Sequence, residues 1–161
     1  MCTDYPDAEL VENIRINARV VEEIIRKEKE GESPLSVEGY KWGESVGGVL
    51  GYLPLEEQGE NKGFDLLILA DVIYNHPQHA NLLKSVKMAM KRSKDAVAVV
   101  VFTPYQPWLM EKIVRFFPLA EENGFVVEKV FEEVLDSLLF EDDPGVSLEL
   151  FWRSELLLTA F

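Results

Sequence analysis

The apolar positions of this chain follow two kinds of pattern. Between residues 7 and 29 they recur every three or four residues, which predicts an amphipathic helix that ends before Gly31 and Pro34. They form unbroken runs at 66–70, within a strand predicted over 64–70, and at 96–102, and such runs are typical of strands covered on both faces in a parallel sheet. Helical patterns follow these runs at 77–93 and 107–123, and Gly124 is placed to end the second one.

Shorter patterns complete the predicted order of elements. Residues 35–40 predict a short strand before the turn KWGES, and the connector at 47–63 begins with a short helix. The last strands are predicted at 125–134 and 148–159, around an acidic loop at 136–145. This alternation predicts a three-layer α/β fold with a mostly parallel sheet and an antiparallel strand pair at one edge. Neither a repeat nor a linker interrupts the pattern, so residues 1–161 are expected to form a single domain.

The composition of the chain limits the classes of partner and the cellular location that we expect. The chain has 161 residues and a formal net charge of -13, so we expect no nucleic-acid or membrane partner but a basic protein partner. Under the alternative interpretation, the acidic residues serve solubility alone. A single cysteine, Cys2, allows no internal disulfide, and no apolar run approaches the roughly 20 residues that span a bilayer. We therefore expect a cytoplasmic monomer.

Candidate chemistry is expected at the carboxyl ends of the strands, where open α/β sheets bind ligands. Asp4 is either a turn residue before the first helix or an acidic residue that holds ribose hydroxyls. Trp42 is either a core residue or a wall for an adenine ring. Asp71 is a costly carboxylate at the end of a buried strand, unless loop solvation accounts for it. His76 and His79 have no cysteine or carboxylate at ligand spacing, so no metal site is expected.

Four motifs in order resemble the family 16, seven-β-strand protein methyltransferases. They are TDYPD at 3–7, GYKWG at 39–43, FDLLILADVIYNH at 64–76 and FTPYQPW at 102–108. The resemblance is strongest to a fungal branch long called nicotinamide N-methyltransferase-like, which modifies the N-terminal amine and lysines of translation elongation factor 1-alpha. It implies a Rossmann-like class I methyltransferase sandwich, S-adenosyl-L-methionine as cofactor and a basic protein substrate. Methylation of a small molecule such as nicotinamide is an alternative.

The resemblance also implies roles for individual residues. Asp4 matches the residue that holds the cofactor ribose, Trp42 the aromatic residue beside the adenine, and Ala70 a small residue whose backbone meets the cofactor. Asp71 and Tyr74 match the Asp-x-x-Tyr that shapes the acceptor pocket. Methyl transfer to an amine mainly requires alignment, and a carboxylate and an aromatic ring can orient a cationic amine.

The family pattern also includes a first strand, a Gly-rich loop of the GxGxG kind and a helix before the TDYPD motif. This chain starts at that motif, so we expect a partial methyltransferase domain without the central strand and without the loop amides that hold the cofactor. Three interpretations stay open. The chain is a fragment or incomplete gene model of an enzyme, a non-catalytic protein-interaction module on the same fold, or an enzyme with a rearranged sheet.

Overall fold

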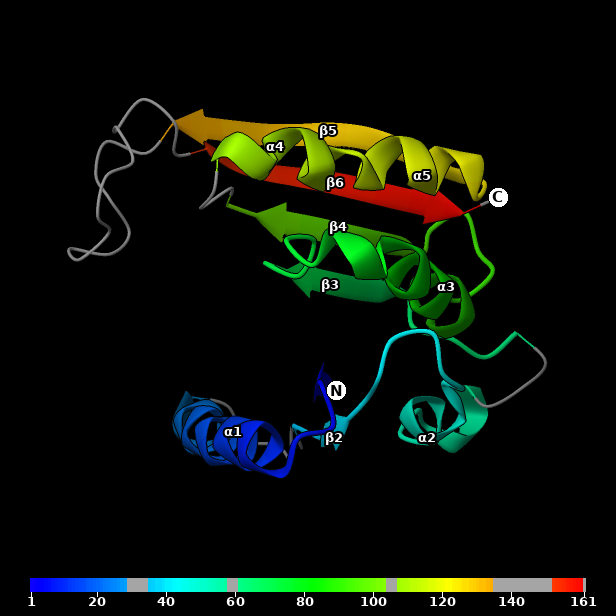
Figure 1. The fold of residues 1–161 in the computed structure, drawn as a ribbon. Coiled ribbons are helices and arrows are strands. Elements are labelled where there is room, and N and C mark those ends of the chain that lie inside the picture. The colour runs from blue at the N-terminus through cyan, green and yellow to red at the C-terminus, as the bar shows by residue number, and fades with distance from the viewer. Residues whose placement is uncertain (29–34, 58–60, 104–106, 135–151, 161) are drawn as a thin grey trace.

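The computed structural model describes residues 1–28, 35–57, 61–103, 107–134 and 152–160, which form two sheets (Figure 1). In the smaller sheet, β1 (Cys2–Asp4) pairs in parallel with β2 (Val37–Gly39). The larger sheet has the order β3-β4-β6-β5. Its strands are β3 (Leu66–Ala70), β4 (Val97–Phe102), β5 (Phe125–Val134) and β6 (Trp152–Ala160).

Strands alternate with helices as predicted, but the larger sheet is not mostly parallel among the described strands. β3 and β4 are parallel, whereas β6 is antiparallel to both of its neighbours, β4 and β5. The antiparallel pair predicted at one edge is therefore present. The predicted loop at 136–145 lies outside the described residues, as do residues 148–151 of the last predicted strand.

Five helices connect the described strands. They are α1 (Ala8–Glu28), α2 (Gly47–Leu50), α3 (His79–Ala89), α4 (Met110–Val114) and α5 (Phe116–Glu122), with single 3₁₀ turns at Leu55–Glu57, His76–Gln78 and Pro107–Leu109. The Asp7 carboxylate caps α1 by accepting hydrogen bonds from the amides of Glu9 and Leu10. No described helix is long and apolar enough to cross a membrane.

Helices α3, α4 and α5 cover one face of the larger sheet (Figure 1). The main core lies between this face and the helices, where Ile73, Leu83, Val100 and Phe116 are fully buried. A second cluster, formed by Val46, Leu50, Leu53 and Ala89, packs the 40–53 segment against the end of α3. This second cluster joins the connector after β2 to the larger sheet.

The prediction that residues 64–70 are buried on both faces is wrong for the described structure. β3 is an edge strand, and its side chains alternate between a covered and an open face. Leu69 is 6% exposed beneath the helices, whereas Leu66 and Ile68 point the other way and are 56% and 67% exposed. No described helix covers that second face, although its side chains are as apolar as those of the first.

Two helix predictions need correction. The helix predicted over 107–123 is split at Arg115 because Pro118 has no amide to donate to Val114 and its ring crowds that carbonyl. The helix predicted to reach residue 93 ends at Ala89, after which Met90 is extended and forms a bridge with Phe64. The remaining ends agree closely, and Gly124 follows α5 with a φ of 87°.

Candidate functional site

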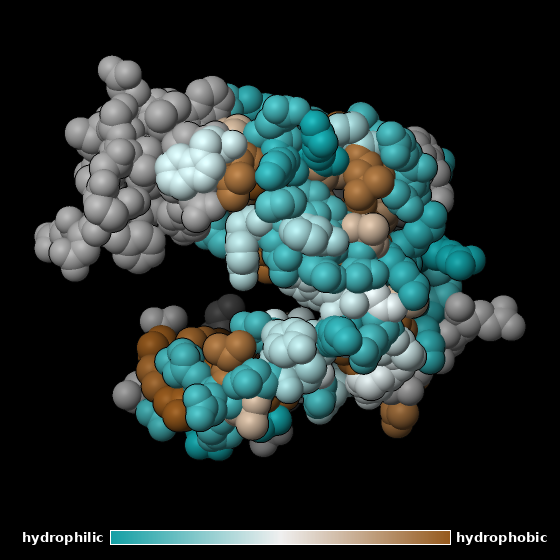
Figure 2. Space-filling view, viewed as in Figure 1, coloured by the Kyte–Doolittle hydropathy of each residue, from teal (hydrophilic) through white to brown (hydrophobic). Residues whose placement is uncertain are grey.

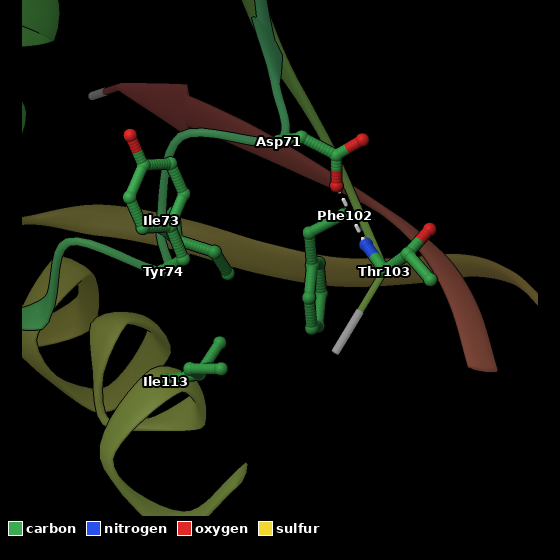
Figure 3. A pocket seen from close by; sticks show the side chains of 6 residues that line it. All are labelled: Asp71, Ile73, Tyr74, Phe102, Thr103 and Ile113. Atoms are coloured by element: carbon green, nitrogen blue, oxygen red, sulfur yellow. Dashed lines mark hydrogen bonds between the residues drawn. The ribbon is translucent and has the colours of Figure 1, made fainter. Parts of the chain in front are cut away.

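Asp71 is the first residue after β3, and it joins the ends of two strands. Its amide donates to the carbonyl of Val101 at 2.8 Å, and its Oδ1 accepts from the amide of Thr103 at 2.8 Å (Figure 3). Its φ of 49° lies in the left-handed region, which aspartate tolerates better than most residues. The side chain is exposed, so the burial cost expected from the sequence does not arise.

The turn after Asp71 alternates between buried and exposed side chains. Ile73 is completely buried in the main core, whereas Tyr74 is 65% exposed. The amide of His76 donates to the carbonyl of Tyr74 at 2.9 Å and starts the 3₁₀ turn that leads into α3. The buried Ile73 therefore anchors a turn that keeps both Asp71 and Tyr74 at the surface.

These residues line a shallow surface pocket with a cavity volume of about 10 Å³, which is about the space of one water molecule. Its lining consists of Asp71, Ile73, Tyr74, Phe102, Thr103 and Ile113. Figure 3 shows side chains from the turn after β3, the end of β4 and helix α4 gathered around it. The lining combines apolar side chains with a carboxylate, a phenol and a threonine hydroxyl. Such a lining can contact an aliphatic chain that lies across it and ends in a cation.

Asp4 lies at the end of β1, with its side chain exposed. Its Oδ1 accepts from the amide of Tyr5 at 2.6 Å, which is a local turn contact. Its backbone carbonyl accepts from the amide of Tyr40 at 2.7 Å, just beyond the end of β2. Asp4 is therefore fixed beside the segment that carries Trp42.

Trp42 is half-buried and packs against the main core. Ser85 of α3 holds its turn, because Ser85 Oγ accepts from the amide of Gly43 at 2.7 Å, lies 3.0 Å from the Tyr40 hydroxyl and donates to the Asn81 carbonyl at 2.9 Å. Gly43 has a φ of 86°, and a Cβ there would lie 2.8 Å from Asn81 Oδ1. The turn therefore requires glycine for its conformation and for its close contact with α3.

The structure brings only part of the predicted set into one place. Asp71 and Tyr74 share the pocket, and Ala70 is the exposed last residue of β3 directly before it. Asp4 and Trp42 lie at the ends of β1 and β2 and are absent from the pocket lining. No three His, Cys, Asp or Glu side chains gather closely enough to bind a metal in the part of the chain that the structure describes.

Sequence reasoning placed Thr103 at a strand end without a role, and it missed the role of His79. Thr103 contributes a backbone amide, which leaves no signal in the side-chain pattern except its place after a predicted strand. The sequence suggests His79 only as a possible metal ligand, yet it is buried and its Nε2 lies 2.7 Å from the carbonyl of Ile73. The only sequence signal for this role is the presence of a second histidine, His79, at the end of the DVIYNHPQH stretch.

The parallel strands alternate with helices and carry polar residues at their ends, so the fold is of the α/β class and is consistent with a Rossmann-like arrangement. The chain is homologous over most of its length to fungal protein N-terminal and lysine N-methyltransferases, as the four motifs indicated. It is 49% identical over 96% of its length to the enzyme of that name from Emericella nidulans and covers 61% of that protein. The enzyme of the same name from Aspergillus fumigatus is 55% identical over 91% of this chain, which covers 53% of that protein. The one from Schizosaccharomyces pombe is 38% identical over 89% of this chain, which covers 52% of that protein.

The chain thus spans little more than half the length of the curated relatives it matches. No family model matches it.

Proposed function

We propose that this chain is part of an S-adenosyl-L-methionine-dependent protein N-methyltransferase that acts on an amine of a basic protein. The observation that carries the proposal is the fixed Asp71 carboxylate beside Tyr74 at an open, largely apolar pocket. The names of the homologues support the same chemistry. The resemblance to the fungal branch points to translation elongation factor 1-alpha as the substrate.

The acceptor side of the mechanism follows from the lining of the pocket. The aliphatic part of a lysine side chain, or the first residues of a protein, would lie against Phe102 and Ile113. The Asp71 carboxylate would accept a hydrogen bond from the amine and stabilise the positive charge that develops on nitrogen. The Thr103 amide would keep that carboxylate in one orientation, and the Tyr74 ring would face the cation.

The donor side rests on Asp4, Trp42 and Ala70. Bound S-adenosyl-L-methionine would supply the methyl group for in-line transfer to the amine. The residues fit such a ligand, because the Asp4 carboxylate is exposed at a strand end, Trp42 is half-buried in a fixed turn and Ala70 leaves the end of β3 uncrowded. Asp4 would hold the ribose hydroxyls, Trp42 would border the adenine, and the Ala70 backbone would contact the cofactor.

We further infer that residues 1–161 form one partial domain and that another strand belongs between β1 and β3. Among the described strands, none pairs with the outer edge of β1 or of β3. Figure 2 shows the surface hollowed between the smaller sheet with α1 and the larger sheet, and apolar surface over α1. The exposed apolar residues of α1 include Leu10, Ile16, Val20, Val21 and Ile24. A strand and its Gly-rich loop would complete the sheet and add amides for the methionine end of the cofactor.

The shape of the pocket favours a protein acceptor over nicotinamide. A small aromatic substrate would need a deep enclosure, whereas Asp71 and Tyr74 are exposed at an open rim. The formal charge of -13 favours a basic partner near that rim. The other candidate is a non-catalytic interaction module, which would bind a basic protein with no dependence on the cofactor. We expect the protein in the cytoplasm, as a monomer.

The test is calorimetric titration of S-adenosyl-L-methionine and S-adenosylhomocysteine into the chain, followed by transfer of a labelled methyl group to purified elongation factor 1-alpha. Micromolar binding, together with labelling that Asp71→Asn slows about 10²-fold, would support the proposal. Binding of the acceptor by a folded chain that takes neither cofactor form would contradict catalysis and support the interaction module. A version extended with the additional strand and loop separates a missing segment from a wrong assignment.

A further inference from the structure

His79 is a buried imidazole with no part in the proposed methyl transfer. It is the first residue of α3 and one of two buried polar side chains among the described residues. Its Nε2 lies 2.7 Å from the carbonyl oxygen of Ile73. A carbonyl can only accept, so Nε2 carries the proton and donates it.

The partner of that hydrogen bond lies in the centre of the turn that forms the pocket rim. Ile73 falls between Asp71 and Tyr74, and it lines the pocket itself. The bond joins this turn to the start of α3, six residues further along the chain. Without it, the Ile73 side chain would still be anchored in the core, but its peptide group would lose the contact that sets its direction.

The ring of His79 is itself held by aromatic neighbours. Phe116, fully buried on α5, meets it edge to face, with ring centres 5.2 Å apart and an angle of 77°. Phe116 contacts Phe117 at 5.6 Å, and Phe117 packs at 5.8 Å against Phe102 of the pocket lining. The donor is therefore fixed by the same core that forms the apolar side of the pocket.

We propose that His79 is a positioning residue for the acceptor site, because its hydrogen bond fixes the Ile73 peptide and with it the directions of Asp71 and Tyr74. The part of this inference that concerns the acceptor rests on the proposed function; the part that concerns the turn does not. Burial lowers the pKa of His79, and the nearby His76 lowers it further, although the Ile73 carbonyl opposes them. The neutral imidazole with its proton on Nε2 is the form that donates the hydrogen bond to the Ile73 carbonyl.

Two substitutions separate the donor from the bulk of the ring. His79→Gln keeps an N–H at about the position of Nε2, whereas His79→Phe keeps an aromatic ring and removes the donor. His76→Gln is the matched control, because His76 precedes the same helix and its buried Nδ1 has no hydrogen-bond partner within the described residues. Each variant is made in the full chain.

The first readout is hydrogen–deuterium exchange of a peptide that covers residues 71–78. His79→Phe is expected to speed its exchange about fivefold, as loss of one neutral hydrogen bond implies, while a β4 peptide stays unchanged. In His79→Gln and His76→Gln, the exchange rate of this peptide should stay close to that of the unchanged protein. Equal exchange in all variants would overturn the inference, and so would nitrogen shifts in the NMR spectrum that place the His79 proton on Nδ1.

The second readout separates acceptor from cofactor. His79→Phe should raise the KM of the protein acceptor about fivefold and leave the dissociation constant of S-adenosylhomocysteine unchanged, with recovery in His79→Gln. A loosened turn with an unchanged KM would reduce His79 to a structural role and overturn its part in acceptor positioning. If the unchanged protein transfers no methyl group, the proposed function fails, and exchange alone decides whether His79 fixes the turn.

Discussion

The amide of Thr103 donates a hydrogen bond to Oδ1 of Asp71, so the carboxylate after β3 is held by the end of β4. β3 and β4 are parallel, and their carboxyl ends therefore lie at the same edge of the sheet. The bond sets the direction of the carboxylate by backbone geometry, independently of any flexible side chain. A substrate amine would thus meet a charge whose position is already determined before binding.

The charge of Asp71 can be removed without removing its hydrogen bond. Asp71→Asn keeps an oxygen acceptor and tolerates the φ of 49°, so we expect a change in unfolding free energy below about 1 kcal/mol. We expect kcat/KM for the protein acceptor to fall about 10²-fold, because the charge that stabilises the transition state is lost. Steady-state kinetics and urea unfolding check the two expectations.

Asp65→Asn is the matched control for that substitution. Asp65 comes just before the opposite end of β3 and forms a 3.2 Å ion pair with Lys91, with its side chain 60% exposed. Removing this surface pair should leave methyl transfer within about twofold and change stability by less than about 1 kcal/mol. Equal losses of activity in the two variants would show that the Asp71 charge has no special place in the reaction.

Ser85 offers a test of the turn that holds Trp42. Ser85→Ala leaves the Gly43 amide without its acceptor and should cost about 2 kcal/mol of unfolding free energy. If Trp42 borders the adenine, the dissociation constant of S-adenosylhomocysteine should rise as well. Ser93→Ala removes an acceptor of the Asp95 amide that takes no part in holding this turn, so it should leave the constant unchanged. Calorimetry that finds the same constant for both variants would argue against a cofactor role for the turn.

Two glycines with nearly the same φ allow backbone strain to be separated from steric contact. Gly43 and Gly124 have φ values of 86° and 87°, but a Cβ on Gly43 would meet Asn81 at 2.8 Å, whereas one on Gly124 would meet no atom within 4 Å. Gly124→Ala should therefore cost about 1 kcal/mol, from conformation alone. Gly43→Ala should cost more, and Asn81→Ala should recover part of the excess in a double-mutant cycle by urea unfolding. Equal costs would show that α3 yields to the added methyl group.

The pKa of His79 predicts how stability changes with pH. Burial holds this pKa below its ordinary value of 6.5 in the folded state, against the smaller opposing effect of the Ile73 carbonyl, and the nearby His76 lowers it further. Above pH 6.5 both states are neutral at this position, so stability does not depend on it. Below pH 6.5 the unfolded chain binds a proton at this position more strongly than the folded chain does. The free energy of unfolding therefore falls as pH decreases.

Urea unfolding between pH 7.5 and 5 checks that expectation. In His79→Gln, the free energy of unfolding should lose the part of its pH dependence that His79 causes. In His76→Gln, most of that pH dependence should remain. An unchanged slope in His79→Gln would assign the pH dependence to other groups.

The sequence predicts most elements well because their signals are local. The apolar spacing of α1 and the Asp7 cap lie within one segment, and so do the strand-end positions of Asp71 and Tyr74. The contributions of Thr103 and His79 depend on backbone groups that approach from other elements, which residue types do not record. The burial of β3 was wrongly predicted because an apolar run shows that both faces are apolar, and says nothing about which segments cover them.

The two faces of β3 give the final prediction. Leu69 lies under the helices, whereas Ile68 is exposed, although the two are neighbours on one strand. In residues 1–161 alone, Leu69→Ala should lower the free energy of unfolding by about 3 kcal/mol and Ile68→Ala by less than about 0.5 kcal/mol. If another segment of a longer protein completes the sheet and covers the second face, Ile68→Ala should become costly in that longer protein. A cost below 0.5 kcal/mol there as well would mean that this face of β3 stays uncovered, and the proposed completion of the fold would be wrong.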